Sequence, residues 1–142
     1  MSTFILDEFL TYKLHRLSKL IDQKLDFGND EYDISYSEGR VLAVIGYHKT
    51  LSVNGLANKS NLDKSQASRA TAALVDKGLV AKTKSDRDSR SFELSLTAKG
   101  ELAYHAIIPR IHERNELALS ALDDDERKQL LALLDKVVDG LG

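Results

Sequence analysis

The stretch DKSQASRATAALVDKG, residues 63–78, decides the fold predicted for this chain. Asp63 and Gln66 have the spacing of a capping box, in which each side chain accepts a hydrogen bond from the other residue's backbone N–H, so a helix is predicted to begin at Lys64. Gly78 supplies a residue that adopts the left-handed conformation at which helices end. Between these limits, small and aliphatic residues recur at helical spacing and predict one buried face: Ala67, Ala70, Leu74 and Val75.

The first two turns of this predicted helix are rich in hydrogen-bond donors and contain no carboxylate. The residues concerned are Lys64, Ser65, Gln66, Ser68 and Arg69. A DNA major groove presents base-edge acceptors flanked by phosphates, so this surface suits a nucleic acid. A solvated helix face is the alternative interpretation, and the neighbouring segments decide between the two.

A short helix and a tight turn precede this helix. Ser52 is placed to cap a helix that reaches about Asn58, and residues 59–62 lead from there to Asp63. Asn61 stands where a turn between two helices requires a positive φ, which asparagine tolerates better than most residues. The order of short helix, turn and capped second helix predicts a helix-turn-helix.

A predicted β-hairpin follows the second helix directly. Residues 79–84 and 92–96 favour strands, the latter with strict alternation of apolar and polar side chains, and residues 85–91 form a polar turn. A hairpin at this place in the chain is typical of the wing of a winged-helix domain.

The tip of this hairpin carries Arg87 and Arg90. Arginine on such a loop can enter a narrow minor groove, where the negative potential is strongest. Asp86 and Asp88 are repelled by phosphate, so at least one of them is expected to hold an arginine in place. A solvated loop is the alternative for this segment taken alone.

One more helix is predicted before the helix-turn-helix. Residues 27–30 break the preceding helical pattern with turn residues, and Ser35 and Glu38 then have capping-box spacing. The residues expected to bury this helix are Val41, Leu42, Ile45 and Tyr47. A brief extended link is predicted at residues 50–51.

Long helices are predicted towards both ends of the chain. One spans about residues 2–25, and another runs from about 98 to 119 with Thr97 as its cap and Pro109 expected to kink or divide it. The last begins at residues 123–126, whose carboxylates suit the positive end of the helix dipole. Because the first and last helices carry more apolar surface than a small body can bury, two chains are expected to intertwine them in a two-fold dimer.

The composition indicates a globular domain without cysteine chemistry. The chain has 142 residues, of which 42% are hydrophobic and 30% charged, so a single domain is expected. Its lack of cysteine excludes disulfides and thiolate metal sites. We expect a cytoplasmic protein, because the sequence contains no leader-like succession and no apolar run of the length that crosses a membrane.

The charge is unevenly distributed. The whole chain carries −2, but the segment from Lys59 to Arg90 contains eight Lys or Arg and four Asp, a net charge of +4. A basic segment on an acidic body is what a directed contact with DNA requires.

In the order of these features, the chain resembles the MarR family of transcriptional regulators. The segments that carry the resemblance are LDKSQASRATAALVDKGLV at 62–80, DSR at 88–90, LTAKG at 96–100 and residues 121–136, in an order and spacing that cover nearly the whole chain. The chain departs from the family at Asn61, where glycine is common. Its lack of cysteine sets it apart from the peroxide-sensing members.

The resemblance implies a mainly α fold with a small β-wing, built as an intertwined homodimer. Within one domain of residues 1–142, it implies a winged helix-turn-helix at about 35–96 and a helical dimerisation region at about 2–25 and 97–142. The implied function is a sequence-specific DNA-binding transcriptional regulator, a repressor that a small aromatic or anionic ligand releases from a pseudo-palindromic operator.

The resemblance also implies roles for individual residues. The positions of Ser65, Gln66, Ser68 and Arg69 face the major groove in the family. The position of Arg90 enters the minor groove, braced by that of Asp88, and Asp63 is implied to orient Arg90 besides capping its helix. Together with Lys64 and Arg87, these residues make up the predicted DNA-binding set.

A ligand site between the dimerisation and DNA-binding parts is a further implication of the resemblance. Arg16 is predicted to pair with a ligand carboxylate. Its predicted neighbours are Tyr12, His15, Tyr36 and Tyr47. Core or interface positions for the tyrosines, and a surface position for Arg16, are the alternative.

Other classes of function receive less support. His105 and His112 are seven residues apart, but Pro109 disturbs the helical phase between them, so solvated or interface histidines are favoured over a metal site. No cofactor is predicted, and no catalytic motif organises the Ser, His and Asp residues, so an enzyme is not expected. A winged-helix protein-interaction module without DNA binding is the remaining alternative, and the arginines of the basic segment argue against it.

Overall fold

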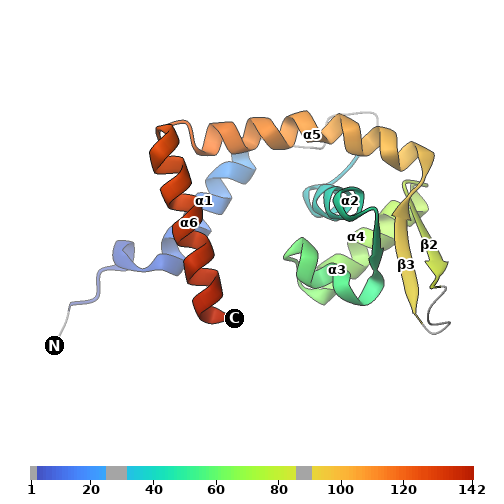
Figure 1. Cartoon of the computed structure of the whole chain (residues 1–142), viewed down its shortest axis with the longest axis horizontal. Coiled ribbons are helices and arrows are strands. Elements are labelled where there is room, and N and C mark those ends of the chain that lie inside the picture. The colour runs from blue at the N-terminus through green and yellow to red at the C-terminus, as the bar shows by residue number, and fades with distance from the viewer. Residues whose placement is uncertain (1–2, 25–31, 86–90) are drawn as a thin grey trace. The chain divides into compact units, whose positions relative to one another are not determined.

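The computed structural model describes residues 3–24, 32–85 and 91–142, which belong to two compact units. The first unit comprises Met1–Lys24 and His112–Gly142, and the second comprises Leu25–Ile111. Within the described residues, the first unit is helical and the second combines helices with a small sheet (Figure 1). The predicted turn at residues 27–30 lies outside the described residues.

The second unit is a helix-turn-helix followed by a hairpin. Its elements are α2 (Tyr36–His48), β1 (Thr50–Ser52), α3 (Val53–Ser60), α4 (Lys64–Asp76), β2 (Val80–Lys84), β3 (Phe92–Leu96) and the first part of α5 (Ala98–Ala118). The three strands form one antiparallel sheet in the order β1-β3-β2. The residues predicted as an extended link therefore form a third strand, in which Leu51 pairs with Leu94.

The core of this unit is built around α2, which packs against α3, α4, β1 and β3. Its fully buried side chains include Val41, Leu42 and Ile45, as predicted. The other large side chains buried with them are Ile34, Leu74, Leu79, Leu94 and Ile107. Each such side chain contributes roughly 1.5–3 kcal/mol through removal from water. The core therefore holds the helix-turn-helix and the sheet as one body.

Tyr47 does not belong to this core, and its predicted burial is wrong. Its side chain is 75% exposed. It follows Ile45 by two residues, which places it about 200° around the helix, on the side away from the buried face. Beside it, Gly46 is buried because the ring of Tyr104 lies on it, where a Cβ would stand 2.4 Å from Cδ1 of that ring.

Side-chain caps begin the helices at the positions that the sequence predicts. Ser35 and Ser52 accept hydrogen bonds from the backbone N–H groups of Glu38 and Gly55, at 3.2 and 3.0 Å. Thr97 Oγ1 accepts one from Gly100 N at 3.0 Å. Each bond satisfies a backbone donor that the first turn of a helix leaves without a partner.

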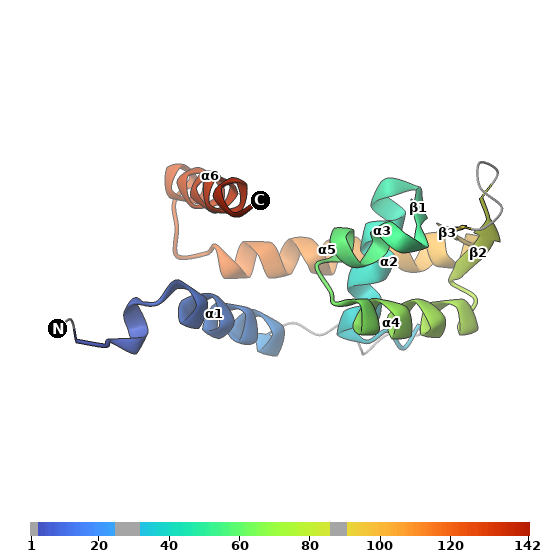
Figure 2. The same cartoon turned by 90° about the horizontal axis from the view of Figure 1, so that it is seen from below.

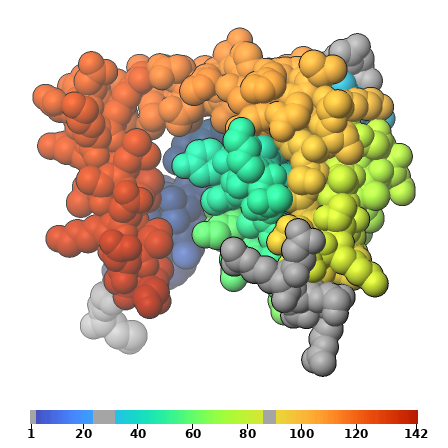
Figure 3. Space-filling model, turned by 45° about the vertical axis from the view of Figure 1, so that its right-hand side comes forward, coloured from blue at the N-terminus to red at the C-terminus, as the bar shows by residue number. Residues whose placement is uncertain are grey.

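The start of α5 crosses close to the end of α4. Thr97 Oγ1 donates to the carbonyl of Gly78 at 2.6 Å, and Thr97 N donates to the carbonyl of Leu79 at 3.1 Å. At Gly100 a Cβ would stand 1.9 Å from the Leu79 carbonyl oxygen, so only glycine permits this approach. In Figure 3 the first half of α5, in yellow and orange, lies over the teal atoms of the segment around α2 and β1.

The first unit contains a 3₁₀ turn, η1 (Leu6–Glu8), α1 (Leu10–Lys24), the end of α5 and α6 (Asp124–Leu141). One continuous helix over residues 2–25 was predicted, and this is wrong. The backbone of Phe9 is extended, with φ −89° and ψ 128°, and separates η1 from α1. The ring of Phe9 contacts that of Phe4 at a centroid distance of 4.9 Å, which holds the chain in this bent path.

Pro109 lies within α5, which is a single helix across it. Of the two predicted effects of Pro109, a kink or a division, the structure excludes the division. A proline in a helix leaves the carbonyl four residues earlier without an N–H partner. Pro109 and His105 are both exposed, so water can solvate the carbonyl that is left.

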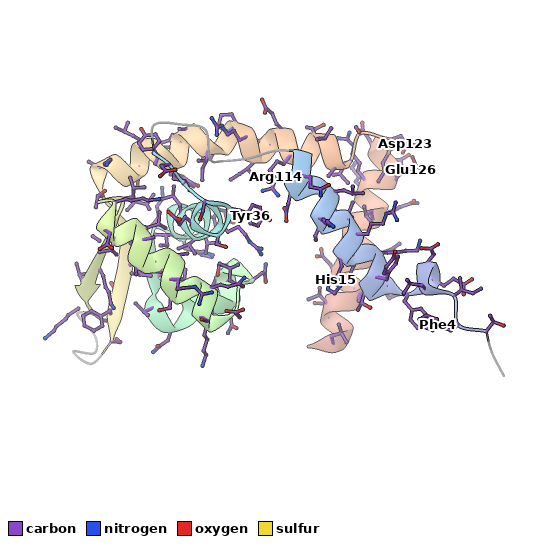
Figure 4. All side chains as sticks on the ribbon, turned by 180° about the vertical axis from the view of Figure 1, so that it is seen from behind. Phe4, His15, Tyr36, Arg114, Asp123 and Glu126 are labelled. Carbon is purple, nitrogen blue, oxygen red and sulfur yellow. The ribbon has the colours of Figure 1, made fainter. Side chains whose placement is uncertain are left out.

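Ion pairs connect the helices of the first unit. Arg114 Nη2 lies 2.6 Å from Asp22 Oδ1, which joins α5 to α1, and Arg127 Nη1 lies 2.9 Å from Glu116 Oε2, which joins α6 to α5. Figure 4 labels Arg114 on α5 and shows Asp123 and Glu126, which form the capping box of α6.

Candidate nucleic-acid interface

The helix-turn-helix is formed by α3, a tight turn and α4 (Figure 2). Asn61 in the turn has φ 57° and ψ 33°, which confirms the predicted left-handed conformation. Leu62 N donates to the carbonyl of Ala57 at 3.2 Å, and the chain then enters α4 through Asp63. The turn therefore fixes the direction in which α4 leaves α3.

The predicted capping box begins α4. Gln66 N donates to Asp63 Oδ1 at 2.7 Å, and Asp63 N donates to Gln66 Oε1 at 3.4 Å. At the other end, Gly78 has φ +75°, the left-handed conformation predicted for the residue that ends the helix. Both local signals in the sequence thus determine where this helix starts and stops.

The polar side of α4 is exposed over its first two turns, and its apolar side is buried. Lys64, Ser65, Gln66, Ser68 and Arg69 are all exposed. Ala67, Ala70 and Leu74 are buried as predicted.

Two residues on the apolar side of α4 differ from the prediction. Val75, which was predicted to be buried, is 37% exposed, because it lies beyond the edge of the buried face. Thr71 is buried in its place, and its hydroxyl donates to the carbonyl of Ala67 at 2.7 Å.

Arg69 is held along the helix surface. Its Nη1 donates to the hydroxyl oxygen of Ser65, one turn earlier, at 2.7 Å. An exposed guanidinium that keeps donors available in a fixed orientation suits recognition of guanine or phosphate.

Two side chains of α2 hold the two ends of α4. Arg40 Nη2 donates to the carbonyls of Ser60 and Asn61, at 3.0 and 3.2 Å, in the turn that precedes α4. At the other end, Lys77 Nζ donates to the carboxylate of Glu38. Neither contact is predicted from the sequence, because each joins residues that lie far apart in the chain. The signal available for Arg40 was a charged residue directly before Val41, which the helical pattern predicts to be buried.

The Glu38–Lys77 pair also shifts the titration of the carboxyl group. Burial alone raises the pKa of Glu38, but hydrogen bonds from Lys77 and Ser35 and the charge of Lys77 outweigh it, so the pKa lies below its ordinary value of 4.5. Lys77 Nζ also donates to the carbonyl of Asp33, and the Lys77 carbonyl accepts from Lys99 Nζ at 3.1 Å. The C-terminal end of α4 is thus bonded to α2, α5 and the chain before α2.

A groove of about 600 Å³ runs along one flank of α4. Lys64 and Ser68 of α4 line it together with Lys82 of β2. Its apolar lining comes from α3 and α4 and includes Val53, Leu56, Ala57, Ala67 and Val75. This flank of the helix therefore stays open to a large partner.

The tip of the wing lies outside the described residues, and so do Arg87, Asp88 and Arg90. The described base of the hairpin is closed by a hydrogen bond from Ser85 N to the carbonyl of Ser91 at 3.0 Å. On β2, Lys82 and Lys84 are exposed two residues apart, and the ammonium of Lys82 lies 4.8 Å from the ring centroid of Phe92. The base of the hairpin thus carries positive charge.

The residues predicted to bind a ligand are divided between the two units. Tyr12, His15 and Arg16 line a hollow of about 450 Å³ along α1, together with Lys19, Leu20 and Gln23. Tyr36 and Tyr47 belong to the second unit, at opposite ends of α2. Tyr36 is half-buried and Tyr47 contacts His48 edge-on at 5.0 Å. Figure 4 labels His15 on α1 and Tyr36 at the start of α2.

The histidines of α5 have ordinary surroundings. His105 Nε2 lies 3.7 Å from Glu101 Oε2 one turn away, and His112 is exposed. In the part of the chain that the structure describes, no three His, Cys, Asp or Glu residues are grouped so that they could hold a metal ion. In that same part, every helix is too short or too polar to cross a membrane.

Comparison with known proteins agrees with this architecture. Residues 32–91 match the model of the MarR family. Among curated proteins, the HTH-type transcriptional regulator BilQ of Clostridium symbiosum is 32% identical over 93 residues, which are 66% of this chain and 65% of BilQ. This chain spans 64–66% of the length of the first curated relatives that it matches.

Solved structures extend the similarity to nearly the whole chain. A MarR family transcriptional regulator from Silicibacter pomeroyi superposes with a TM-score of 0.82 and 26% identity, over 96% of this chain and 92% of that one. BpsR of Bordetella bronchiseptica has the same fold, with a TM-score of 0.86, 17% identity and coverage of 97% and 99%. The segment with the helix-turn-helix, residues 32–91, therefore matches the MarR family, and a regulator of that family has the same fold along almost the full chain.

Proposed function

We propose that this protein is a sequence-specific DNA-binding transcriptional regulator that places α4 in the major groove. The observation that carries the proposal is the exposed polar side of the first two turns of α4, which contains no carboxylate. Its Lys64, Gln66 and Arg69 offer donors to base-edge acceptors and phosphates. A helix that served only to cover a core would not require such a composition.

The surroundings of α4 support the same partner. Lys82 and Lys84 are exposed on β2, and Lys59 is exposed in the last turn of α3. These cations lie in the segment whose net charge is +4 on a chain of net charge −2. Phosphate contacts of this kind supply much of the affinity of proteins for DNA and position the recognition helix. From its place in the sequence between β2 and β3, we propose that Arg90 contacts the minor groove and that Asp88 braces it, with Arg87 as a further DNA contact.

A second copy of the chain is proposed as the partner of the first unit. None of the residues of α6 is buried, although the helix carries large apolar side chains that are 43–85% exposed: Leu131, Leu133, Val137, Val138 and Leu141. On α1 the side chains of Leu10, Leu14, Leu17 and Leu20 are 38–50% exposed. Apolar surface of this extent is covered in stable proteins, and a two-fold dimer would cover both faces. The dimer would also supply two copies of α4 for a pseudo-palindromic operator.

We further propose that a small aromatic or anionic ligand acts as effector and releases a repressor from its operator. The hollow on α1 combines the aromatic ring of Tyr12 with the cationic side chains of Arg16 and Lys19 and the titratable side chain of His15. An aromatic ring and a guanidinium suit an aromatic carboxylate. Among proteins of this fold, the DNA binding of BpsR is regulated by 6-hydroxynicotinic acid.

Binding to the promoter region of its own gene or a divergent neighbouring gene tests the proposal. We expect a retarded complex that an excess of unrelated duplex does not remove, and at least a tenfold loss of affinity in Arg69→Ala. The matched control is Lys128→Ala, which removes a cation from the exposed surface of α6. A chain that binds no duplex at micromolar concentration would favour the alternative, a winged-helix module that binds other proteins.

A further inference from the structure

We infer that Arg40, a residue of α2, positions the N-terminal turn of α4 for contact with bases without itself contacting DNA. The inference rests on the proposed function, because it concerns how the recognition helix is held. It assigns a role in DNA recognition to a side chain outside the helix-turn-helix.

The side chain of Arg40 donates hydrogen bonds to the backbone of the turn. Its Nη2 lies 3.0 Å from the carbonyl oxygen of Ser60 and 3.2 Å from that of Asn61. These are the last residue of α3 and the left-handed residue that follows it. One guanidinium nitrogen therefore bridges the two carbonyls between which the chain changes direction.

The turn has a physical need for this cation. The last carbonyls of a helix lack N–H partners within the helix and carry its partial negative charge. The hydroxyl of Ser60 does not relieve its own carbonyl, since it donates to the carbonyl of Leu56 at 2.7 Å. Ser60 is only 3% exposed, so a carbonyl without a partner there would be costly.

The two halves of α4 differ in how they are held. The C-terminal half is fixed by the buried Thr71 and Leu74 and by the bond from Lys77 to Glu38. The N-terminal turn presents exposed Lys64, Ser65 and Gln66. Its direction is therefore set by the buried Ala67 and by the turn that Arg40 holds, which lies two residues before Asp63. Contact with base edges requires side chains to be placed within about 0.5 Å, so a loosened turn impairs base contacts before it impairs phosphate attraction.

The ring of Tyr36 supports the guanidinium from the other side. The Arg40 Cζ atom lies 5.6 Å from the centroid of this ring, within the range of a cation–π contact. Arginine is suited to this place because its planar group can stack on a ring while its donors stay fixed in the plane. A lysine ammonium could donate to the carbonyls, but it has no planar group to stack on the ring.

The test compares the wild-type chain with Arg40→Met and Arg40→Lys on two duplexes. One is the operator selected by the wild-type protein, the other an unrelated sequence, and both are measured over a salt series. For Arg40→Met we expect operator affinity to fall about tenfold, as for a lost hydrogen bond to a charged group. The affinity of Arg40→Met for the unrelated duplex should stay within twofold of the wild-type value. The slope of its affinity against salt concentration should equal that of the wild type within error. The operator affinity of Arg40→Lys should lie between those of the wild-type chain and Arg40→Met.

The control is Lys59→Met, which removes an equal charge from the exposed end of α3. We expect it to leave the ratio of operator to unrelated affinity unchanged. If Arg40→Met instead weakens both duplexes equally and lowers the salt slope by about one, Arg40 contacts phosphate and the inference is wrong. Unchanged operator affinity in Arg40→Met would also overturn it.

Hydrogen exchange separates positioning from a general loss of stability. In Arg40→Lys, the amides of residues 61–66 should exchange faster, while those of residues 70–75 keep their protection. Faster exchange over the whole second unit would overturn the inference in favour of a purely structural role. If the wild-type chain binds no duplex at all, the proposed function fails, and the exchange pattern still decides whether Arg40 orders this turn.

Discussion

Gly100→Ala should destabilise the second unit far more than an ordinary helix substitution. A Cβ at residue 100 would stand 1.9 Å from the carbonyl oxygen of Leu79, whereas ordinary contact begins at 3.4 Å, so the start of α5 must move by about 1.5 Å. The obstacle is backbone, which cannot rotate away as a side chain can. The displacement breaks the bonds from Thr97 to the carbonyls of Gly78 and Leu79.

The expected magnitude follows from these losses. Two hydrogen bonds contribute about 1 kcal/mol each, and the forced displacement of packed groups about 1–3 kcal/mol. Alanine returns roughly 0.5–1 kcal/mol through its better helix propensity. The free energy of unfolding should therefore fall by about 3 kcal/mol, a large part of the 5–15 kcal/mol typical of a small domain.

Urea unfolding, followed by circular dichroism and extrapolated to water, measures this change. The matched control is Gly140→Ala in α6, where a Cβ meets no atom of the chain within 4 Å. The control should leave stability unchanged or raise it by up to about 1 kcal/mol. A Gly100→Ala chain within 0.5 kcal/mol of the wild type would refute the reasoning, since the two backbones would then not need to touch.

Three further perturbations test the helix ends and the clamp on α4. Asp63→Ala removes the side-chain acceptor of the Gln66 N–H and should lower the free energy of unfolding, measured in urea, by about 1 kcal/mol; no change would show that the cap is dispensable. Asn61→Val places a β-branched residue at φ 57° and should cost more than 1 kcal/mol in the same assay, while Asn61→Gly is tolerated; equal effects would contradict the left-handed turn. Because the pKa of Glu38 is lowered on folding, its contribution to stability is complete above pH 4.5 and is lost as the pH falls through the lower, folded-state value. Glu38→Gln should reduce that acid-induced loss in thermal unfolding, and an identical pH profile would exclude this carboxylate as its source.

Much of the second unit could be predicted because its signals are local. The capping box at Asp63, the positive φ of Asn61 and the strand at residues 92–96 each depend on neighbours in sequence, and each is confirmed. The exposed donors of α4 were predictable for the same reason. A helix with one buried face necessarily leaves its other face exposed.

Contacts between distant residues were not predictable in this way. Arg40 reaches carbonyls 20 and 21 residues away, and Lys77 reaches a carboxylate 39 residues away, so no spacing in the sequence reveals them. The strand at Thr50–Ser52 is too short to show a period and exists because β3 offers an edge to pair with. A proline inside a helical pattern predicts a kink or a break, but α5 continues through Pro109, because Pro109 is exposed and water can solvate the carbonyl left without a partner.

Selection of duplexes from a random-sequence pool by the wild-type protein tests the central claim most directly. If α4 contacts bases as one of a symmetric pair, the selected sequences should converge on a pseudo-palindrome with half-site centres about 10–10.5 base pairs apart, or a multiple of that spacing. The same selection with Arg69→Ala should lose its preference at one position in each half-site. Failure of the wild-type protein to enrich any sequence, or an Arg69→Ala pool identical to the wild-type pool, would contradict the account.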